Sequence, residues 1–309
     1  MKGYLSPILI LLAFLTSSVG NAEDIKHRIL VSGCGLGAIS IIGEDAQTEW
    51  SMLIATEVSD SILLKNGNVL HSCKTEGIRE IKPDYASGKG GKTVWEWKPE
   101  VINGKSGEVH SCQLLPDGKI LVGESHDGIS YLKEIDHATG KVVKSVELKG
   151  LGDQHSTFRQ VRKTPTGTYL ITHFSGKASA KEFDAQGKLL RTFPDGKYTA
   201  IRLPNKNTLI SCGDSHRIIE VDETNKIVWE IKQNDLEGVS LGFAAGLQRL
   251  PNGNTVIVNW GGHGGAKGPA VIEVTPDKKV VWQTTTGIKN MVSSIQILDK
   301  NIQSKEQLR

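Results

Sequence analysis

The sequence QRLPNGNTV at residues 248–256 contains an apolar strand, a Pro/Asn/Gly turn and the start of a second strand. Such a turn between two apolar runs is typical of a β-hairpin. The same pattern recurs as ILLKNGNVL at 62–70, QLLPDGKIL at 113–121, RKTPTGTYL at 162–170 and IRLPNKNTL at 201–209. A hairpin that returns at intervals of roughly 40 to 50 residues indicates a repeat fold.

Each hairpin is followed by two further strand-like segments. The first of them carries a glutamate before an apolar residue, at Glu80, Glu134, Glu182, Glu220 and Glu273. The second follows a polar turn and reads KTVW at 92–95, KVVK at 141–144, KLLR at 188–191, KIVW at 226–229 and KVVW at 279–282. Four antiparallel strands in each repeat are typical of the blades of a β-propeller.

The two ends of the chain complete a sixth repeat. Residues 28–52 match the second, third and fourth strands of a blade, and residues 293–299 match a first strand. Pairing the two ends would close the ring and remove two exposed sheet edges. The sequence therefore predicts an all-β fold, a six-bladed β-propeller whose C-terminal strand pairs with the N-terminal blade.

The N-terminus has the pattern of a secretory signal peptide. Lys2 is followed by the apolar run Ile8 to Leu15 and by small residues that end at Ala22. We expect residues 1–22 to be the signal peptide, with cleavage near Ala22, and residues 23–309 to be the propeller. The mature protein is expected in the periplasm or outside the cell, as a monomer without a membrane span, because the apolar run is too short to cross a bilayer.

Charge and cysteine content restrict the partners and the chemistry. The 37 Lys and Arg residues against 34 Asp and Glu residues give a net charge of +3 without a long run of one sign, so a nucleic-acid partner is not expected. An exported chain can form disulfides. The four cysteines, Cys34, Cys73, Cys112 and Cys212, allow buried thiols, disulfides or a metal or catalytic role.

Histidines concentrate at one end of the predicted channel. In a propeller, the starts of first strands and the loops between second and third strands share one end. Seven of the nine histidines map there: His71, His110, His126, His155, His173, His216 and His263. We therefore predict a site for a small polar ligand, either anionic or carbohydrate-like, at this channel mouth. The residues expected to bind it are Arg159, His110, His155, His173, Asp214, Trp260 and His263.

The residues at this channel mouth could also support proton transfer or bind a metal ion. Imidazoles beside a carboxylate can transfer protons, so the candidate catalytic residues are His110, His126, His216 and Glu124. Oxygen ligands suit Ca²⁺, and the candidates are Glu124, Asp214 and Asn259. Each of these residues also has a structural alternative. The histidines and acidic residues can cap turns, and Arg159 can pair with an acidic residue of a neighbouring blade.

The segments 91–95 (GKTVW) and 225–230 (NKIVWE) resemble the pyrroloquinoline-quinone-like repeat, in which a Trp docks between blades. The resemblance covers nearly the whole chain after Ala22 and implies a quinoprotein-like propeller, although Lys144 and Arg191 stand at the Trp position in two blades. Dehydrogenases with this repeat are larger rings, so the quinone itself is not expected. The ring also resembles bacterial arylsulfotransferases, which have six blades with His and Arg at one channel mouth.

Three functions are therefore open. The predicted function is an exported propeller that binds a small polar ligand without turnover, because this requires only convergent polar groups. The first alternative is an enzyme at the same mouth, either sulfotransferase-like, as the second resemblance implies, or a metal-assisted lactonase or lyase. The second alternative is a protein-interaction scaffold.

Overall fold

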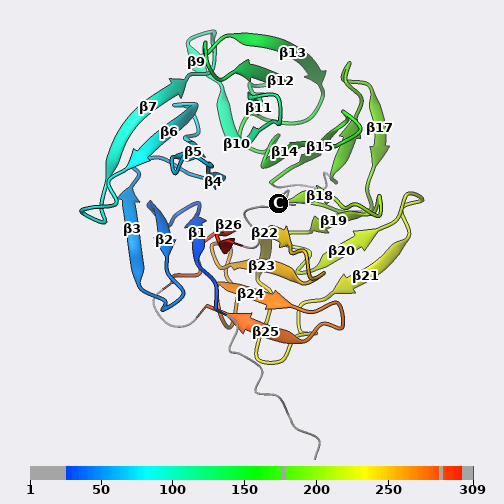
Figure 1. The fold of residues 1–309 in the computed structure, drawn as a ribbon. Helices are drawn as coiled ribbons and strands as arrows, with labels where there is room; N and C mark the ends of the chain where they lie inside the picture. Colours follow the sequence, from blue (N-terminus) through cyan, green and yellow to red (C-terminus); the bar gives the residue numbers. More distant parts are fainter. Residues whose placement is uncertain (1–25, 175–178, 285–287, 301–308) are drawn as a thin grey trace, which may run out of the picture.

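A computed structural model describes residues 26–174, 179–284, 288–300 and 309. These residues form a ring of six blades around a central channel, and each blade is a four-stranded antiparallel sheet (Figure 1). The predicted fold class is thereby confirmed. The predicted signal peptide lies outside the described residues.

Blades are numbered here in chain order, and the strands of each blade run from the channel outward. Blade 1 contains β26 (Ser294–Ile297), β1 (Ile29–Ser32), β2 (Ala38–Ile42) and β3 (Thr48–Leu53). Blade 2 contains β4 (Ser61–Leu63), β5 (Val69–Ser72), β6 (Ile78–Pro83) and β7 (Gly91–Trp97). Blade 3 contains β10 (Glu108–Leu114), β11 (Lys119–Ser125), β12 (Ile129–Asp136) and β13 (Val142–Lys149).

The other three blades repeat this order. Blade 4 contains β14 (Gln160–Lys163), β15 (Tyr169–Thr172), β16 (Lys181–Phe183) and β17 (Leu189–Thr192). Blade 5 contains β18 (Ala200–Arg202), β19 (Thr208–Ser211), β20 (Ile218–Val221) and β21 (Ile227–Ile231). Blade 6 contains β22 (Phe243–Arg249), β23 (Thr255–Trp260), β24 (Val271–Val274) and β25 (Val280–Gln283). A small hairpin of β8 (Val101–Ile102) and β9 (Lys105–Ser106) connects blades 2 and 3.

The ring closes as predicted. In blade 1, β26 pairs with β1 in antiparallel register from Ile29 opposite Ile297 to Ser32 opposite Ser294. The red strand beside the blue strands in Figure 1 is this closure. The innermost strand of blade 1 therefore comes from the opposite end of the chain, and the inner edge of β1 is paired.

The turn of the repeated hairpin requires a left-handed residue. Four copies place a glycine there, and Gly253 has φ +88°. In blade 5 the position is occupied by Lys206, which adopts φ +69°. Because a side chain disfavours this region, the fifth copy retains its turn at a small conformational cost.

The recurrent glutamate of the third strand connects neighbouring blades. In the described chain, five glutamates each form an ion pair with a side chain of the next blade. The pairs are Glu80–His137 (2.6 Å), Glu134–Lys163 (2.7 Å), Glu182–Arg202 (2.6 Å), Glu220–Arg249 (2.9 Å) and Glu273–His27 (2.6 Å). Between blades 1 and 2 the indole Nε1 of Trp50 instead donates to the carbonyl of Gly90 (2.7 Å).

Apolar side chains fill the space between blades. Leu121 and Leu132 of blade 3, for example, form one buried cluster with Val161 and Ile171 of blade 4. All four cysteines are free, and only Cys34 is partly exposed. No helix in the described part of the chain is long and apolar enough to span a membrane.

Candidate functional site

The seven histidines assigned to the channel mouth lie at the expected positions relative to the strands. His110 lies in β10 and His71 in β5, while His155 precedes β14. The other four directly follow or lie shortly beyond the second strands of their blades: His126 after β11, His173 after β15, His216 after β19 and His263 after β23. The structure brings only some of them into mutual contact.

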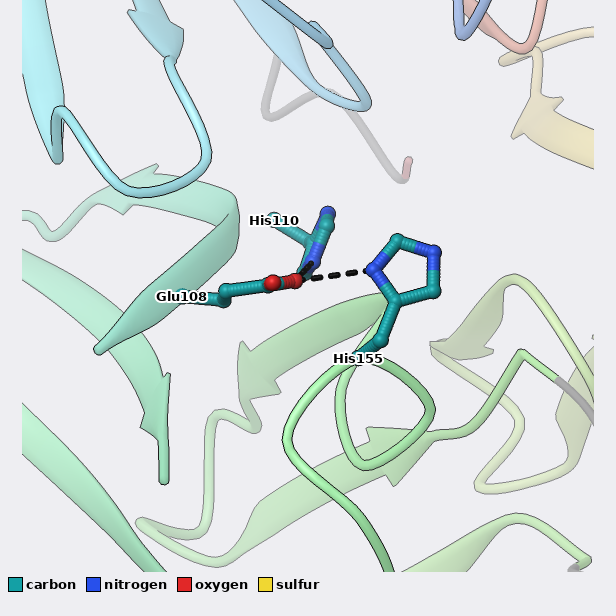
Figure 2. Close-up of side chains that lie close together, drawn as sticks. All are labelled: Glu108, His110 and His155. Carbon is teal, nitrogen blue, oxygen red and sulfur yellow. Dashed lines mark hydrogen bonds and ion pairs between the residues drawn. The ribbon is translucent and has the colours of Figure 1, made fainter. Parts of the chain in front are cut away.

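Glu108 connects two of these histidines (Figure 2). Its Oε2 atom lies 2.9 Å from Nε2 of His110 and 2.8 Å from Nδ1 of His155. Glu108 and His110 are two residues apart in β10, which directs both side chains to the same side of the strand. His110 is buried, whereas the side chain of His155 is 42% exposed. The group therefore has a buried inner part and an outer part that solvent reaches.

Arg159, Glu57 and Lys74 extend this group. Nη2 of Arg159 lies 3.1 Å from Nε2 of His155 and 3.6 Å from Oε1 of Glu57. Nη1 of Arg159 donates to the carbonyl of His155 at 3.0 Å, and the side chain is only 1% exposed. Nζ of Lys74 lies 3.9 Å from Glu57 and 3.8 Å from Glu108. We refer to Glu57, Lys74, Glu108, His110, His155 and Arg159 as the mouth cluster.

The hydrogen-bond donors in the mouth cluster can be assigned from chemistry. A guanidinium has only donors, so Arg159 donates to Nε2 of His155. The ring proton of neutral His155 then resides on Nδ1 and points to Glu108. An ionised carboxylate only accepts, so His110 also donates to Glu108 through Nε2. Both imidazoles are thereby held in defined tautomers around one carboxylate.

The shifted pKa values of this region all move away from neutrality. Burial alone would raise the pKa of Glu108, but hydrogen bonds from the two imidazoles hold it at about 2. Burial would likewise raise the pKa of Glu57, and the neighbouring imidazole and guanidinium groups lower it instead. Burial, aided by the charge of Arg159, lowers the pKa of His110 to about 4. Burial and Glu57 raise the pKa of the Cys34 thiol to about 11.

The mouth cluster also contains a possible set of metal ligands. One donor atom each of Glu108, His110 and His155 lies within 4.8 Å of the others. A metal bound to Nδ1 of His155 would displace the proton from that nitrogen, and in a neutral imidazole the proton then resides on Nε2. Nε2 could no longer accept the hydrogen bond from Arg159. Ligating imidazoles are neutral. The contact with Arg159 therefore has to break before these three residues can hold a metal.

An aromatic cluster borders the mouth cluster. It contains Phe174, Phe243, Trp260 and His263, and the guanidinium carbon of Arg159 lies 3.9 Å from the ring centre of Phe174. Trp260, the predicted ligand platform, is buried and donates from Nε1 to the carbonyl of Cys34 (3.2 Å). Phe174 is half-buried and His263 is exposed, so these two rings form the outer surface of the cluster.

Glu124 and His126 lie elsewhere, between blades 2 and 3. Nε2 of His126 is 2.7 Å from Oε1 of Glu124, and Nζ of Lys133 is 2.8 Å from Oε2. The main-chain nitrogen of Glu100 also donates to Glu124 (3.2 Å), and Nζ of Lys133 lies 5.9 Å from the ring centre of Trp97. Glu124 is fully buried, and its carboxylate binds only groups at this blade interface among the contacts described.

The other predicted residues have separate partners. Asp214 accepts from His263 (2.8 Å) near the surface, and His216 binds the carbonyl of Gly242. His173 lies 3.2 Å from Nζ of Lys181, and burial lowers its pKa to about 4.

Asn259 is buried and holds two loop segments together. It accepts from the main-chain nitrogen of Gly242 (2.8 Å) and donates to the carbonyls of Ser240 (3.1 Å) and Lys267 (3.3 Å). Together with the separate partners of Glu124 and Asp214, these bonds show that the three candidate calcium ligands do not form a common group.

Four residues of this region were not predicted from the sequence: Glu57, Lys74, Glu108 and Phe174. A signal existed for Glu108, since a carboxylate two positions before His110 in a strand shares its face. Glu57 and Lys74 lie in connecting segments of blade 2, and hairpin periodicity carries no information about where such side chains point.

Comparisons with solved structures support the fold. A protein of unknown function from Bacteroides caccae is 29% identical, with a TM-score of 0.74 over 88% of this chain and 98% of that chain. A streptogramin B lyase is 12% identical, with a TM-score of 0.55 over 85% of this chain and 81% of its own. A luciferin-regenerating enzyme is also 12% identical, with a TM-score of 0.52 over 76% and 84%. At this identity the two enzymes share the fold alone.

The family comparison is more specific. No curated protein matches the chain. The resemblances to pyrroloquinoline-quinone-like propellers and to arylsulfotransferases are not confirmed. The sequence profile described as Mal s 1 allergenic protein-like matches residues 32–259, which run from the end of β1 in blade 1 through blades 2 to 5 and into the second strand of blade 6. The chain therefore belongs to the Mal s 1 allergenic protein-like family.

Proposed function

We propose that this propeller binds a small, hydroxyl-rich, carbohydrate-like ligand at the mouth cluster and does not transform it. The observation that carries the proposal is the convergence of two carboxylates, two imidazoles and two cations at the start of the channel, beside an aromatic cluster. Convergent polar groups beside apolar rings are the usual composition of a small-molecule site.

The charges of the mouth cluster favour the carbohydrate-like ligand over the anionic one. Arg159 faces Glu57, and Lys74 faces both Glu57 and Glu108, so each cation already has a carboxylate partner. An anion would compete with these carboxylates. A hydroxyl can donate to a carboxylate and accept from Lys74 or His155 at the same time.

The pKa values favour binding over turnover. General acid–base catalysis is most efficient when the catalytic pKa lies near the working pH. Glu57, Glu108, His110 and Cys34 all have pKa values displaced from neutrality. The streptogramin B lyase and the luciferin-regenerating enzyme share only the fold with this chain. Turnover is therefore tested as a control, by incubating the ligand with the protein.

Replacement of Glu108 by Gln is expected to weaken the binding of the best ligand by about 10- to 100-fold, because a hydrogen bond to a charged group contributes about 1.5–3 kcal/mol. The ligand is first identified by thermal shift against neutral sugars, polyols, sulfated phenols and lactones, and affinity is then measured by calorimetry. The variant Lys105→Met, which removes an exposed lysine, is the matched control.

Two results would contradict this proposal. Unchanged affinity in Glu108→Gln would exclude the mouth cluster as the site. Preferential binding of sulfated phenols or lactones, with new products seen by NMR, would replace binding by catalysis.

We also propose export of the protein, on the basis of the N-terminal sequence. The mass of the protein recovered from the periplasm or medium of an expressing cell is expected to correspond to a chain that begins at Glu23. Recovery of the full-length chain from the cytoplasm alone would contradict export.

A further inference from the structure

A second polar group lies inside the channel, apart from the mouth cluster. Its centre is Asp60, which directly precedes β4. Oδ2 of Asp60 accepts from Nη2 of Arg162 (2.9 Å), and Oδ1 accepts from Nη2 of Arg309 (2.8 Å). Arg309 is the last residue of the sequence, and the chain end marked C lies near the middle of the ring (Figure 1).

Arg309 is bound at three points. Its Nη2 donates to Asp60 and to the main-chain carbonyl of Ser61, and its own main-chain oxygen accepts from Nε of Arg162 (2.8 Å). A carboxylate and a carbonyl that both accept from one guanidinium nitrogen form a receptor for a nitrogen cation with at least two donors. Arg162 cannot use this receptor because it already occupies the other carboxylate oxygen.

Arg309 is held in the receptor at a cost. Its side chain is 7% exposed, and its Nη1 atom is buried without a hydrogen-bond partner. Two guanidinium groups share the Asp60 carboxylate. Burial accordingly lowers the pKa of Arg309. A cavity of about 10 Å³, enough for about one water, lies between Arg309, Asp60, Arg159 and Tyr198.

We propose that Asp60 and the carbonyl of Ser61 form a guanidinium-binding site in the channel, which Arg309 fills and which takes the guanidinium of a separate molecule when Arg309 is absent. The ligand class is an alkylguanidine or an arginine side chain. An alkylammonium fits less well, because it is more strongly hydrated than a guanidinium and the site is buried. The site shares no residue with the mouth cluster, although Arg159 of that cluster lines the same cavity. The proposal does not rest on the proposed carbohydrate-like ligand.

The test is chemical rescue of Arg309→Ala by agmatine. Arg309 belongs to no strand, so the variant retains all six blades. We expect agmatine at about a hundredfold excess over its Kd to raise the Tm of Arg309→Ala by roughly 5 °C. The wild-type protein is expected to shift by less than about 1 °C, because Arg309 competes within the same chain. Butylamine at the same concentration is expected to have little effect on the variant.

The control variant is Arg79→Ala, which removes an arginine from a partly exposed pair with Glu76, and agmatine is not expected to stabilise it. Three results would overturn the proposal. They are no agmatine shift in Arg309→Ala, an equal shift in the wild-type protein, and an equal shift with butylamine.

Discussion

Replacement of Asp60 by Ala is expected to lower the free energy of unfolding by about 3–5 kcal/mol, the cost of removing one partner from a buried ion pair. The Asp60 carboxylate accepts from Arg162, Arg309, the main-chain nitrogen of Cys112 and the hydroxyl of Ser294. These groups come from blades 1, 3 and 4 and from the end of the chain. Without the carboxylate, two buried guanidinium groups face each other uncompensated.

Urea unfolding of the wild-type protein and of Asp60→Ala measures this loss. Asp127→Ala is the matched control, because Asp127 forms an exposed pair with Lys105, and surface pairs contribute about 0–1 kcal/mol. The double variant Asp60→Ala/Arg309→Ala is expected to be more stable than Asp60→Ala, since one of the two uncompensated charges is gone. A loss below about 1 kcal/mol in Asp60→Ala would contradict this account of the channel.

The blades could be predicted from the sequence because their signals are local. The hairpin at 248–256 and its four copies contain the strand and turn residues within nine positions each. Ring closure followed from matching the two incomplete ends, and the pairing of Ile29 with Ile297 confirms it. The glutamate of the third strand was visible as a repeat, but its ion pair with the next blade became apparent only in three dimensions.

The candidate site could be predicted only in part, because its contacts connect distant segments. Strand ends predicted that His110 and His155 lie at one end of the ring, and in the structure both bind Glu108. Asp60 and Arg162 are separated by 102 positions, and no spacing rule predicts that they meet across a channel.

Glu124 lies at the expected position along its strand but does not join the mouth cluster. A carboxylate near the end of a second strand was predicted to reach the mouth. It lies at the interface with blade 2 instead, where the main-chain nitrogen of Glu100 donates to it, and the buried ammonium of Lys133, from the next strand of its own blade, lies 2.8 Å away. The position of a residue along a strand therefore predicts at which end of the ring it lies. The face of the blade to which its side chain points depends on its packing partners.

His27 joins blade 1 to blade 6 where the ring closes. Its Nε2 lies 2.6 Å from Glu273 of blade 6, and its Nδ1 lies 2.6 Å from Asp299, which follows β26. The ring of Trp282 packs edge-on at 4.8 Å. Burial would lower the pKa of His27, but the hydrogen bonds and charges of Asp299 and Glu273 outweigh burial and raise it to about 9.

The contribution of His27 to the stability of the protein is therefore expected to fall as the pH rises from about 6.5 to about 9. A histidine with a raised pKa binds more protons in the native state, so its contribution is complete below the unfolded value near 6.5 and is lost through about 9. The shift corresponds to about 3 kcal/mol. Urea unfolding of the wild-type protein and of His27→Gln at pH 6, 7.5 and 9 measures this contribution as the difference between the two proteins. His27→Gln is expected to flatten this slope, whereas His263→Gln, in the exposed pair with Asp214, is expected to retain it. Equal slopes in the wild-type protein and His27→Gln would show that His27 does not carry the pH dependence.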